Sequence, residues 1–477
     1  MKRRSAGAEV VNEHPLWLYV REAKDRFEDL SDRVWGSPET CYSEHASVAA
    51  HIEELRFQGF ELHEALAGIP TAVMGKYGRE GPVIAFLGEY DALAGLSQKA
   101  DIAQKDPLES GANGHGCGHN LLGSASMLAA TALKRWLAQT GTPGRVRYYG
   151  CPAEEGGAGK AFMVRAGAFD DVDIAITWHP GDVAGFVKGS SLAIARVDFT
   201  FEGRAAHAAD APHLGRSALD AVELMSVGVN YMREHIPDTA RIHSAILDSG
   251  GLSPNVVHAY AKVSYMVRAD TTADMLTLLR RVEKVAEGAA LMTETQVTVD
   301  VNSGSSNLVY NPTLGDLMQR NLDRLGPPPF TSKDTAYAAR FQATLSEDDI
   351  RQSYAAKGIV EKERKALADF NVPASTPAMP FGGSTDVADV SWVVPTVQMW
   401  GATHAIGTQL HSWQAVAQGK GRPALKGMVH AATVMAATAA DALMQPDVLA
   451  RAQEDLARYV GSVGYISPLP KDAMPLA

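Results

Sequence analysis

A cysteine and a histidine separated by one glycine have the types and spacing of metal ligands. The segment 114–120 reads Gly-His-Gly-Cys-Gly-His-Asn and includes Cys117 and His119. A thiolate and an imidazole this close can bind one divalent ion, or two neighbouring ions, where glycines allow the loop to turn. On its own the segment is also consistent with a solvated histidine or a helix cap, so the interpretation depends on the rest of the chain.

Two adjacent carboxylates, Glu154 and Glu155, form a second chemical feature. They lie in the segment 151–157, Cys-Pro-Ala-Glu-Glu-Gly-Gly, directly after an expected strand. Active sites of α/β proteins gather at the carboxyl ends of strands. One of the two carboxylates could bind a metal while its neighbour acts as a base on water. The simpler alternative for an isolated Glu-Glu pair is a solvated turn.

Two further histidines are candidate metal ligands. His179 comes directly after an apolar segment, and His411 lies in the C-terminal part of the chain. Each histidine alone is more often structural than functional, but the combination predicts a divalent metal site, whose candidate ligands are Cys117, His119, one of the two adjacent glutamates, His179 and His411. A thiolate with imidazoles suits zinc, and carboxylates also admit manganese or cobalt.

Alternating strands and helices are expected to position these residues. Short apolar segments predict buried strands at 83–87, 145–151, 174–177 and 393–400, and helical spacing predicts helices at 16–34, 46–58, 121–139, 314–325 and 427–443. Strands alternating with helices indicate an α/β sheet. The sequence from the helix at 314–325 to about Pro380 is charged and irregular, which is typical of surface insertions.

The pattern changes between residues 192 and 302. Alternating polar and apolar residues predict strands at 191–201, 259–266 and 296–301, with helices at 217–235 and 275–291 between them. This order fits a small sheet with both helices on one face. We therefore predict a metal-bearing domain from residues 1–191 and 303–477, interrupted by an inserted domain at 192–302.

Composition excludes several classes of function. The chain has 477 residues and is 46% hydrophobic. Its net charge is −11, and an acidic chain is a poor general ligand for nucleic acid or anionic membranes. Three cysteines are too few for a secreted disulfide scaffold and fit a reducing compartment. No apolar core of signal-peptide length follows the first residues, and we expect a cytoplasmic protein that binds neither membrane nor nucleic acid.

Several segments together resemble the aminoacylase and carboxypeptidase family of dinuclear metal amidohydrolases, in the branch with a Cys-Gly-His motif. They are Gly88-Glu-Tyr-Asp-Ala-Leu-Ala-Gly-Leu-Ser97, 114–123, 151–157, Ala205-Ala-His-Ala-Ala209, 212–221, Ser253-Pro-Asn-Val-Val257 and 386–392. The resemblance implies two divalent ions, manganese or zinc. It also implies an α/β catalytic domain with a mixed central sheet flanked by helices. The inserted domain would then be an α+β dimerisation (lid) domain with a four-stranded sheet and two helices.

The resemblance also implies roles for individual residues. Cys117 stands where relatives have an Asp that bridges two metals, and the other four ligands match His119, Glu155, His179 and His411. Three further positions match a general base (Glu154), a carboxylate that orients a ligand (Asp91) and a histidine that reaches into the partner subunit's active site (His207). Asn255 and Arg268 match groups that hold the terminal carboxylate of the substrate.

Each of the non-ligand roles has an ordinary alternative. Asp91 could cap the following segment, and His207 could be a solvated loop residue. Asn255 follows a proline and could be a turn residue, and Arg268 could form a weak surface ion pair.

The sequence departs from the branch pattern at two places. Asn120 stands where many Cys-Gly-His relatives have Asp, and Ser384-Thr-Asp386 replaces Ser-Glu-Asp. Both differences point towards the aminobenzoyl-glutamate branch. The long region 312–380 could shape an aryl pocket.

The expected activity is hydrolysis of the amide bond of an N-acyl or N-aroyl amino acid, with an aroyl-glutamate as the first candidate. Two alternatives stay open. The same site could release ammonia from an aryl amine, or the chain could be a weakly active subunit that needs a sister chain. We expect a homodimer formed through the inserted domain.

Overall fold

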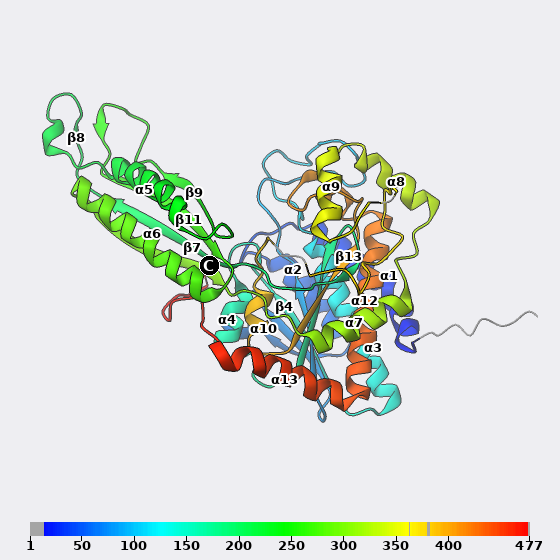
Figure 1. Ribbon diagram of the computed structural model, residues 1–477. Coiled ribbons are helices and arrows are strands. Elements are labelled where there is room, and N and C mark those ends of the chain that lie inside the picture. Colours follow the sequence, from blue (N-terminus) through cyan, green and yellow to red (C-terminus); the bar gives the residue numbers. More distant parts are fainter. Residues whose placement is uncertain (1–13, 362, 379–381, 476–477) are drawn as a thin grey trace, which may run out of the picture.

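The structure is a computed structural model that describes residues 14–361, 363–378 and 382–475. The first ten residues, on which the expected lack of a signal segment depends, and Pro380, the predicted end of the irregular region, lie outside this part. Figure 1 shows a larger α/β part and a smaller, elongated part that projects from it. The α/β class and the mixed central sheet predicted from the sequence are confirmed.

The larger part is built on a seven-stranded sheet. Its strands follow the order β1 (Glu61–Glu64), β2 (Val73–Tyr77), β4 (Arg145–Cys151), β3 (Val83–Glu89), β5 (Ile174–Gly181), β13 (Thr396–Ala402) and β6 (Gly185–Phe186). The four inner strands β4, β3, β5 and β13 are parallel, and antiparallel strands lie at both edges. The carboxyl ends of the parallel strands therefore meet at one edge of the sheet.

Helices cover both faces of this sheet. On one face lie α1 (Leu16–Trp35), α2 (His45–Phe57), α3 (His119–Thr140), α7 (Pro312–Leu325) and α12 (Arg422–Met444). The other face is covered by α4 (Gly159–Arg165) and α10 (Val387–Ser391). All seven residues of β3 are buried, and Ile84 and Phe86 face one core while Ala85 and Leu87 face the other. Burial on both faces explains why this strand lacks polar alternation.

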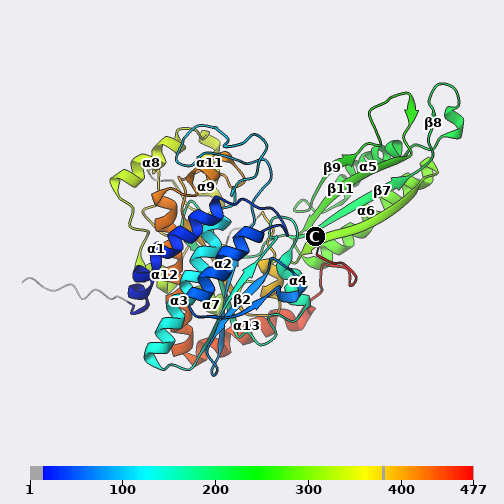
Figure 2. The ribbon, with the colours of Figure 1, turned by 180° about the vertical axis from the view of Figure 1, so that it is seen from behind.

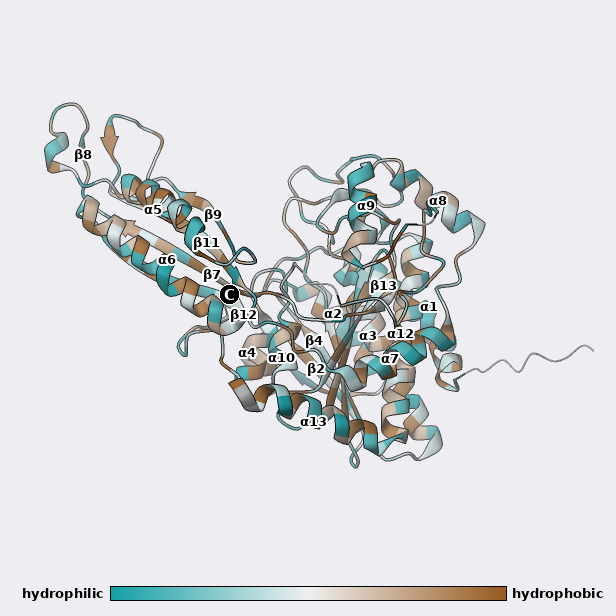
Figure 3. Ribbon diagram, viewed as in Figure 1, coloured by the Kyte–Doolittle hydropathy of each residue, from teal (hydrophilic) through white to brown (hydrophobic). Residues whose placement is uncertain are grey.

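Four antiparallel strands make the sheet of the smaller part, in the order β12 (Gln296–Ser305), β7 (Ala193–Glu202), β11 (Tyr260–Ala269) and β9 (Arg241–Asp248). Helices α5 (Ala218–Met232) and α6 (Thr272–Thr293) share a separate hydrophobic core with it. Helix α6 carries alternating hydrophobic and hydrophilic bands, as an amphipathic helix does (Figure 3). At the far tip, β8 (Ala206–His207) pairs with β10 (Val256–Val257).

Several elements have no counterpart in the sequence prediction, among them β1, β2 and α13 (Pro446–Val463). The region predicted to be irregular contains two helices, α8 (Ser332–Gln342) and α9 (Glu347–Ala356), which lie over the larger part (Figure 2). Strand β9 has no counterpart among the predicted strands, because its last six residues are all exposed and no apolar alternation marks it. The remaining helices are α11 (Trp413–Gln418) and α13.

Among the described residues, α12 alone is long and apolar enough to cross a membrane. However, 83% of its apolar window is buried inside the protein, as in a core helix.

Candidate metal centre

The parallel strands bring the sequence motifs to one edge of the larger sheet. Glu89 ends β3, the Glu154–Glu155 loop follows β4, and His179 lies near the end of β5. The loop before α3 supplies Cys117, and His119 is the first residue of α3. His411 approaches from the segment between β13 and α11. All five predicted ligands are thus brought together.

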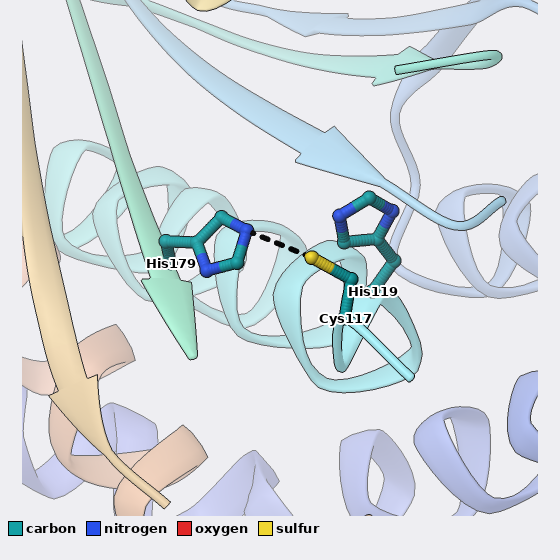
Figure 4. A group of neighbouring side chains, drawn as sticks. All are labelled: Cys117, His119 and His179. Atoms are coloured by element: carbon teal, nitrogen blue, oxygen red, sulfur yellow. Dashed lines mark hydrogen bonds between the residues drawn. The ribbon is translucent and has the colours of Figure 1, made fainter. Parts of the chain in front are cut away.

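Gly118 allows Cys117 and His119 to share one site. Its φ is +74°, in the left-handed region, and a Cβ added there would lie 2.9 Å from the Cβ of Pro180. A side chain at this position would therefore be strained and would collide with the residue that follows His179. The turn at Gly118 lets Cys117 and His119 both project towards β5, from which His179 projects (Figure 4).

The predicted ligand atoms form two groups of three with one member in common, and a third group joins His119 to Glu89 and Glu154. Cys117, His119 and His179 make the first group, and Cys117, Glu155 and His411 make the second. Within each group the ligand atoms all lie within 4.8 Å of one another. The Cys117 Sγ lies 3.4 Å from the His179 Nε2, and the Glu155 Oε2 lies 3.2 Å from the His411 Nε2.

This arrangement fits two divalent ions that share Cys117. The Nε2 of His119 and the Oε1 of Glu155 are buried without a hydrogen-bond partner, which is costly for a polar group unless something binds it. His179 donates its Nδ1 hydrogen to the carbonyl of Pro180 at 2.8 Å, so its Nε2 is left as an acceptor. A thiolate, imidazoles and a carboxylate are the donors that zinc and similar ions take.

The pKa shifts of two ligands, Glu155 and His179, favour the protonation states that bind metal. Burial acts to raise the pKa of Glu155, but the hydrogen bond to His411 and the nearby His119 outweigh it and lower that pKa to about 2. Burial lowers the pKa of His179 to about 4, so this imidazole is neutral, as a metal ligand has to be.

The two adjacent glutamates have different surroundings. Glu155 contacts His411, whereas Glu154 forms no ion pair within the described part of the chain. Burial, and then the nearby Glu89 and Glu155, raise the pKa of Glu154 well above its ordinary range. Perturbed pKa values of this kind are concentrated at functional sites.

The backbone is strained at this centre. Ala153, Ala158 and His411 have φ values of 61°, 53° and 61°, which residues with a Cβ rarely adopt. Two of them flank the glutamate pair and the third is a predicted ligand. Such strain persists where the surrounding structure holds it, and it is concentrated at functional sites.

Asp91 lies against both halves of the centre. Its Oδ1 lies 2.8 Å from the His119 Nδ1, and its Oδ2 accepts a hydrogen bond from the backbone N–H of Glu155 at 2.9 Å. Both carboxylate oxygens are thus used at the site rather than at a helix end.

Sequence reasoning missed a buried ion triad beneath the site. The Lys160 Nζ lies 2.6 Å from the Glu89 Oε1 and 2.6 Å from the Asp386 Oδ1. The other oxygen of Glu89 lies 3.3 Å from the His119 Nε2. No sequence signal joins these residues, because Glu89 and Asp386 are 71 and 226 positions away from Lys160.

Two cavities meet at the predicted metal site. One has a volume of about 450 Å³ and lies between the Glu154–Glu155 loop and the smaller sheet, where Arg268 and the unpredicted Arg196 line it. The other has a volume of about 510 Å³ and is lined partly by residues of the region 312–380. Val187, Trp400, Leu410 and His411 border both cavities.

His207 and Asn255 do not reach this site within one chain. His207 belongs to β8, and Asn255 precedes β10, at the far tip of the smaller part (Figure 1). Both are exposed, and neither lines either cavity. The predicted pairing of Asn255 with Arg268 at one carboxylate therefore does not occur within a single subunit.

The chain is similar to known proteins in sequence and in fold. Residues 85–415 match the profile of Peptidase family M20/M25/M40. The chain is 45% identical to a p-aminobenzoyl-glutamate hydrolase subunit of Escherichia coli K12 over 96% of this chain and 97% of the relative. It is 29% identical to the mouse Xaa-Arg dipeptidase over 90% of this chain and 88% of that protein. In fold it is similar to the Bacillus subtilis YXEP protein, described as a dinuclear metal binding peptidase of the M20 family. The TM-score is 0.56, and the two chains are 18% identical over 90% of this chain and 99% of that one.

Proposed function

Because the chain belongs to Peptidase family M20/M25/M40, we propose that it is a metal-dependent amidohydrolase that cleaves N-aroyl amino acids, with p-aminobenzoyl-glutamate as its first candidate substrate. The observation that carries this proposal is the pair of ligand groups joined at Cys117, beside Glu154, which forms no ion pair among the described residues. The name of the Escherichia coli relative supports the choice of substrate.

The residues that would hold the metals are Cys117, His119, Glu155, His179 and His411. When bound, two divalent ions would polarise the amide carbonyl and lower the pKa of the attacking water. Manganese and zinc are both compatible with this donor set.

Glu154 is the residue that would move protons. It lines the smaller cavity and is not committed to an ion pair within the described residues. We assign it as the base that takes a proton from water as the water adds to the amide carbon. The same carboxyl then gives the proton to the departing nitrogen as the carbon–nitrogen bond breaks, which releases the aroyl acid and the free amino acid.

Arg268 would hold the substrate. Its guanidinium lines the cavity with Glu154 and donates a hydrogen bond to the Ser384 hydroxyl at 3.3 Å. Burial lowers the pKa of Arg268, but an arginine stays protonated in a protein. A half-buried guanidinium is suited to a carboxylate, and we assign it to the α-carboxylate of the leaving amino acid.

The larger cavity is the proposed place for the acyl group. It begins at Trp400 and His411 and extends to Phe186, Gln352 and Val372. A volume of about 510 Å³ is within the range of small-molecule pockets. Helix α9, within the region 312–380, would thus help to shape an aryl pocket.

His207 would serve a neighbouring subunit. Its exposed position at the tip of the smaller part is compatible with reaching a second copy of the chain, where it would stabilise the oxyanion. We therefore propose a homodimer formed through the smaller part. We also propose that the enzyme is cytoplasmic. The Escherichia coli relative is named as a subunit, which leaves room for a sister chain as well.

The test is release of p-aminobenzoate from p-aminobenzoyl-glutamate by the pure chain with manganese or zinc. Metal content and size are measured on the same sample. No release from any aroyl-amino acid by metal-loaded protein would refute the proposal. Ammonia release from anthranilate-like amines would favour the deaminase alternative, and activity that requires an added sister chain would favour the heteromer alternative.

A further inference from the structure

We propose that Arg196 binds the side-chain carboxylate of the leaving amino acid, so that Arg196 and Arg268 together select substrates with an acidic leaving residue. This inference rests on the proposed function and adds a specificity residue to it.

Arg196 is placed at the reaction site by the smaller sheet. It lies on β7 and lines the same cavity as Arg268, Glu154 and Glu155. Its Nη1 is 3.9 Å from the point that a Cβ on Gly156 would occupy. The guanidinium therefore reaches the loop that carries the glutamate pair.

The register of the sheet puts the two arginines on one face as diagonal neighbours. Arg196 pairs with Met266 on β11, and Arg268 lies two residues further along that strand. Diagonal neighbours on a sheet are about 7–8 Å apart at the backbone. Two long side chains at this separation can each contact one of the two carboxylates of a single substrate residue.

Arg196 has no carboxylate partner among the described residues. The nearest acid on its strand, Asp198, is bound to Lys262 at 2.9 Å. Arg196 itself makes a long polar contact, from its Nε to the Ser264 hydroxyl at 3.5 Å. A half-buried guanidinium without a counter-charge favours an anion in the cavity.

Two guanidinium groups in one cavity set a clear preference. They attract a leaving residue with two carboxylates and repel a cationic one. The chain should thus differ from the mouse Xaa-Arg dipeptidase, to which it is 29% identical, in the charge of the residue it releases.

The experiment compares kcat/KM for p-aminobenzoyl-glutamate, p-aminobenzoyl-glutamine and p-aminobenzoyl-alanine, with metal-loaded protein. We expect the wild-type enzyme to prefer the glutamate substrate. Arg196→Met should lower kcat/KM for that substrate by about 10- to 100-fold, which corresponds to one charge-assisted hydrogen bond, and should change the other two less than about twofold. Arg268→Met should lower all three.

Two further variants are compared, the conservative Arg196→Lys and the control Arg280→Met. The lysine variant keeps the charge and should retain more of the preference than Arg196→Met. Arg280 is exposed on α6 and away from the cavity, so Arg280→Met should match the wild-type protein on all three substrates.

Equal losses on all three substrates in Arg196→Met would overturn the inference, as would a wild-type enzyme that cleaves the glutamine and glutamate substrates equally well. If the enzyme turns over these substrates without this selectivity, only the proposed role of Arg196 is refuted. An absence of turnover on every substrate removes the proposed function and the inference together.

Discussion

The carboxylate of Asp91 joins His119 to the loop that carries Glu155. One oxygen lies 2.8 Å from the His119 Nδ1, and the other accepts the backbone N–H of Glu155 at 2.9 Å. His119 belongs to the first metal-ligand group and Glu155 to the second. A single buried side chain thus fixes the relative position of the two groups.

Asp91→Asn is expected to weaken metal binding by about 10- to 100-fold, because the amide no longer fixes the tautomer and orientation of His119. Competition with a chromogenic chelator would measure the change. Asp106→Asn, which alters only a surface pair with Lys99, is the matched control. Wild-type affinity in Asp91→Asn would show that His119 is held by its packing alone.

Glu154→Gln and Glu155→Gln should separate catalysis from metal binding. The first variant is expected to keep both metals and to lose about 100- to 10,000-fold in kcat, the usual contribution of a general base. The second should lose metal, because Glu155 contacts His411 within a ligand group. Metal analysis and turnover of the same samples test both expectations. If Glu154→Gln turns over near the wild-type rate, another group is the base.

The buried triad makes a prediction about stability. Lys160→Met would leave Glu89 and Asp386 facing each other in the core without a counter-charge, and removing one partner of a buried ion pair costs about 3–5 kcal/mol. Urea unfolding of metal-loaded protein would measure the loss. Lys365→Met removes a surface pair with Asp369 and should have little effect. A Lys160→Met protein as stable as the wild type would mean that one of the carboxylates is protonated in the native state.

Apart from His411, each residue of the metal site could be predicted because its signal is local. Cys117 and His119 flank a glycine, and Glu154, Glu155 and His179 lie at the ends of buried strands. Parallel strands end at one edge of the sheet, so motifs far apart in the sequence are expected to meet there.

The rest of the site depends on pairings that no local pattern reveals. Lys160 reads as an ordinary helix residue until the fold puts two distant carboxylates beside it. Arg196 stands out only because Asp198 is paired with Lys262. By contrast, α8 and α9 begin with capping boxes at Thr331 and Ser346, a local signal from which both helices can be recognised.

Buried neutral histidines predict a loss of stability in acid. Burial lowers the pKa of His430 to about 4, against about 6.5 in an unfolded chain. Below pH 6.5 the unfolded chain therefore binds a proton that the folded chain does not, and stability falls as the pH drops towards 4. At pH 5 this one residue should cost about 2 kcal/mol.

His430→Gln tests this cost. The glutamine can still donate to the Gly326 carbonyl, which accepts from the His430 Nε2 at 2.7 Å. The difference in unfolding free energy between pH 7 and pH 5 should be about 2 kcal/mol smaller in His430→Gln than in the wild type, whatever the metal ligands contribute to both. The exposed His63→Gln should leave the difference unchanged. An unaltered pH dependence in His430→Gln would mean that His430 is protonated in the folded protein.

The distance between His207 and the metal ligands leads to a test of the subunit arrangement. His207→Ala and Glu154→Gln should each be nearly inactive alone. The two variants are mixed in equal amounts and allowed to exchange subunits, so that half of the dimers are hybrids. If His207 serves the partner's site, each hybrid has one intact site of two. About a quarter of the wild-type activity should then return. Mixing Glu154→Gln with Cys117→Ser should restore nothing, because both of those residues come from the same chain. No recovery in the first mixture, with hybrids verified by mass spectrometry, would mean that His207 acts within its own chain or not at all.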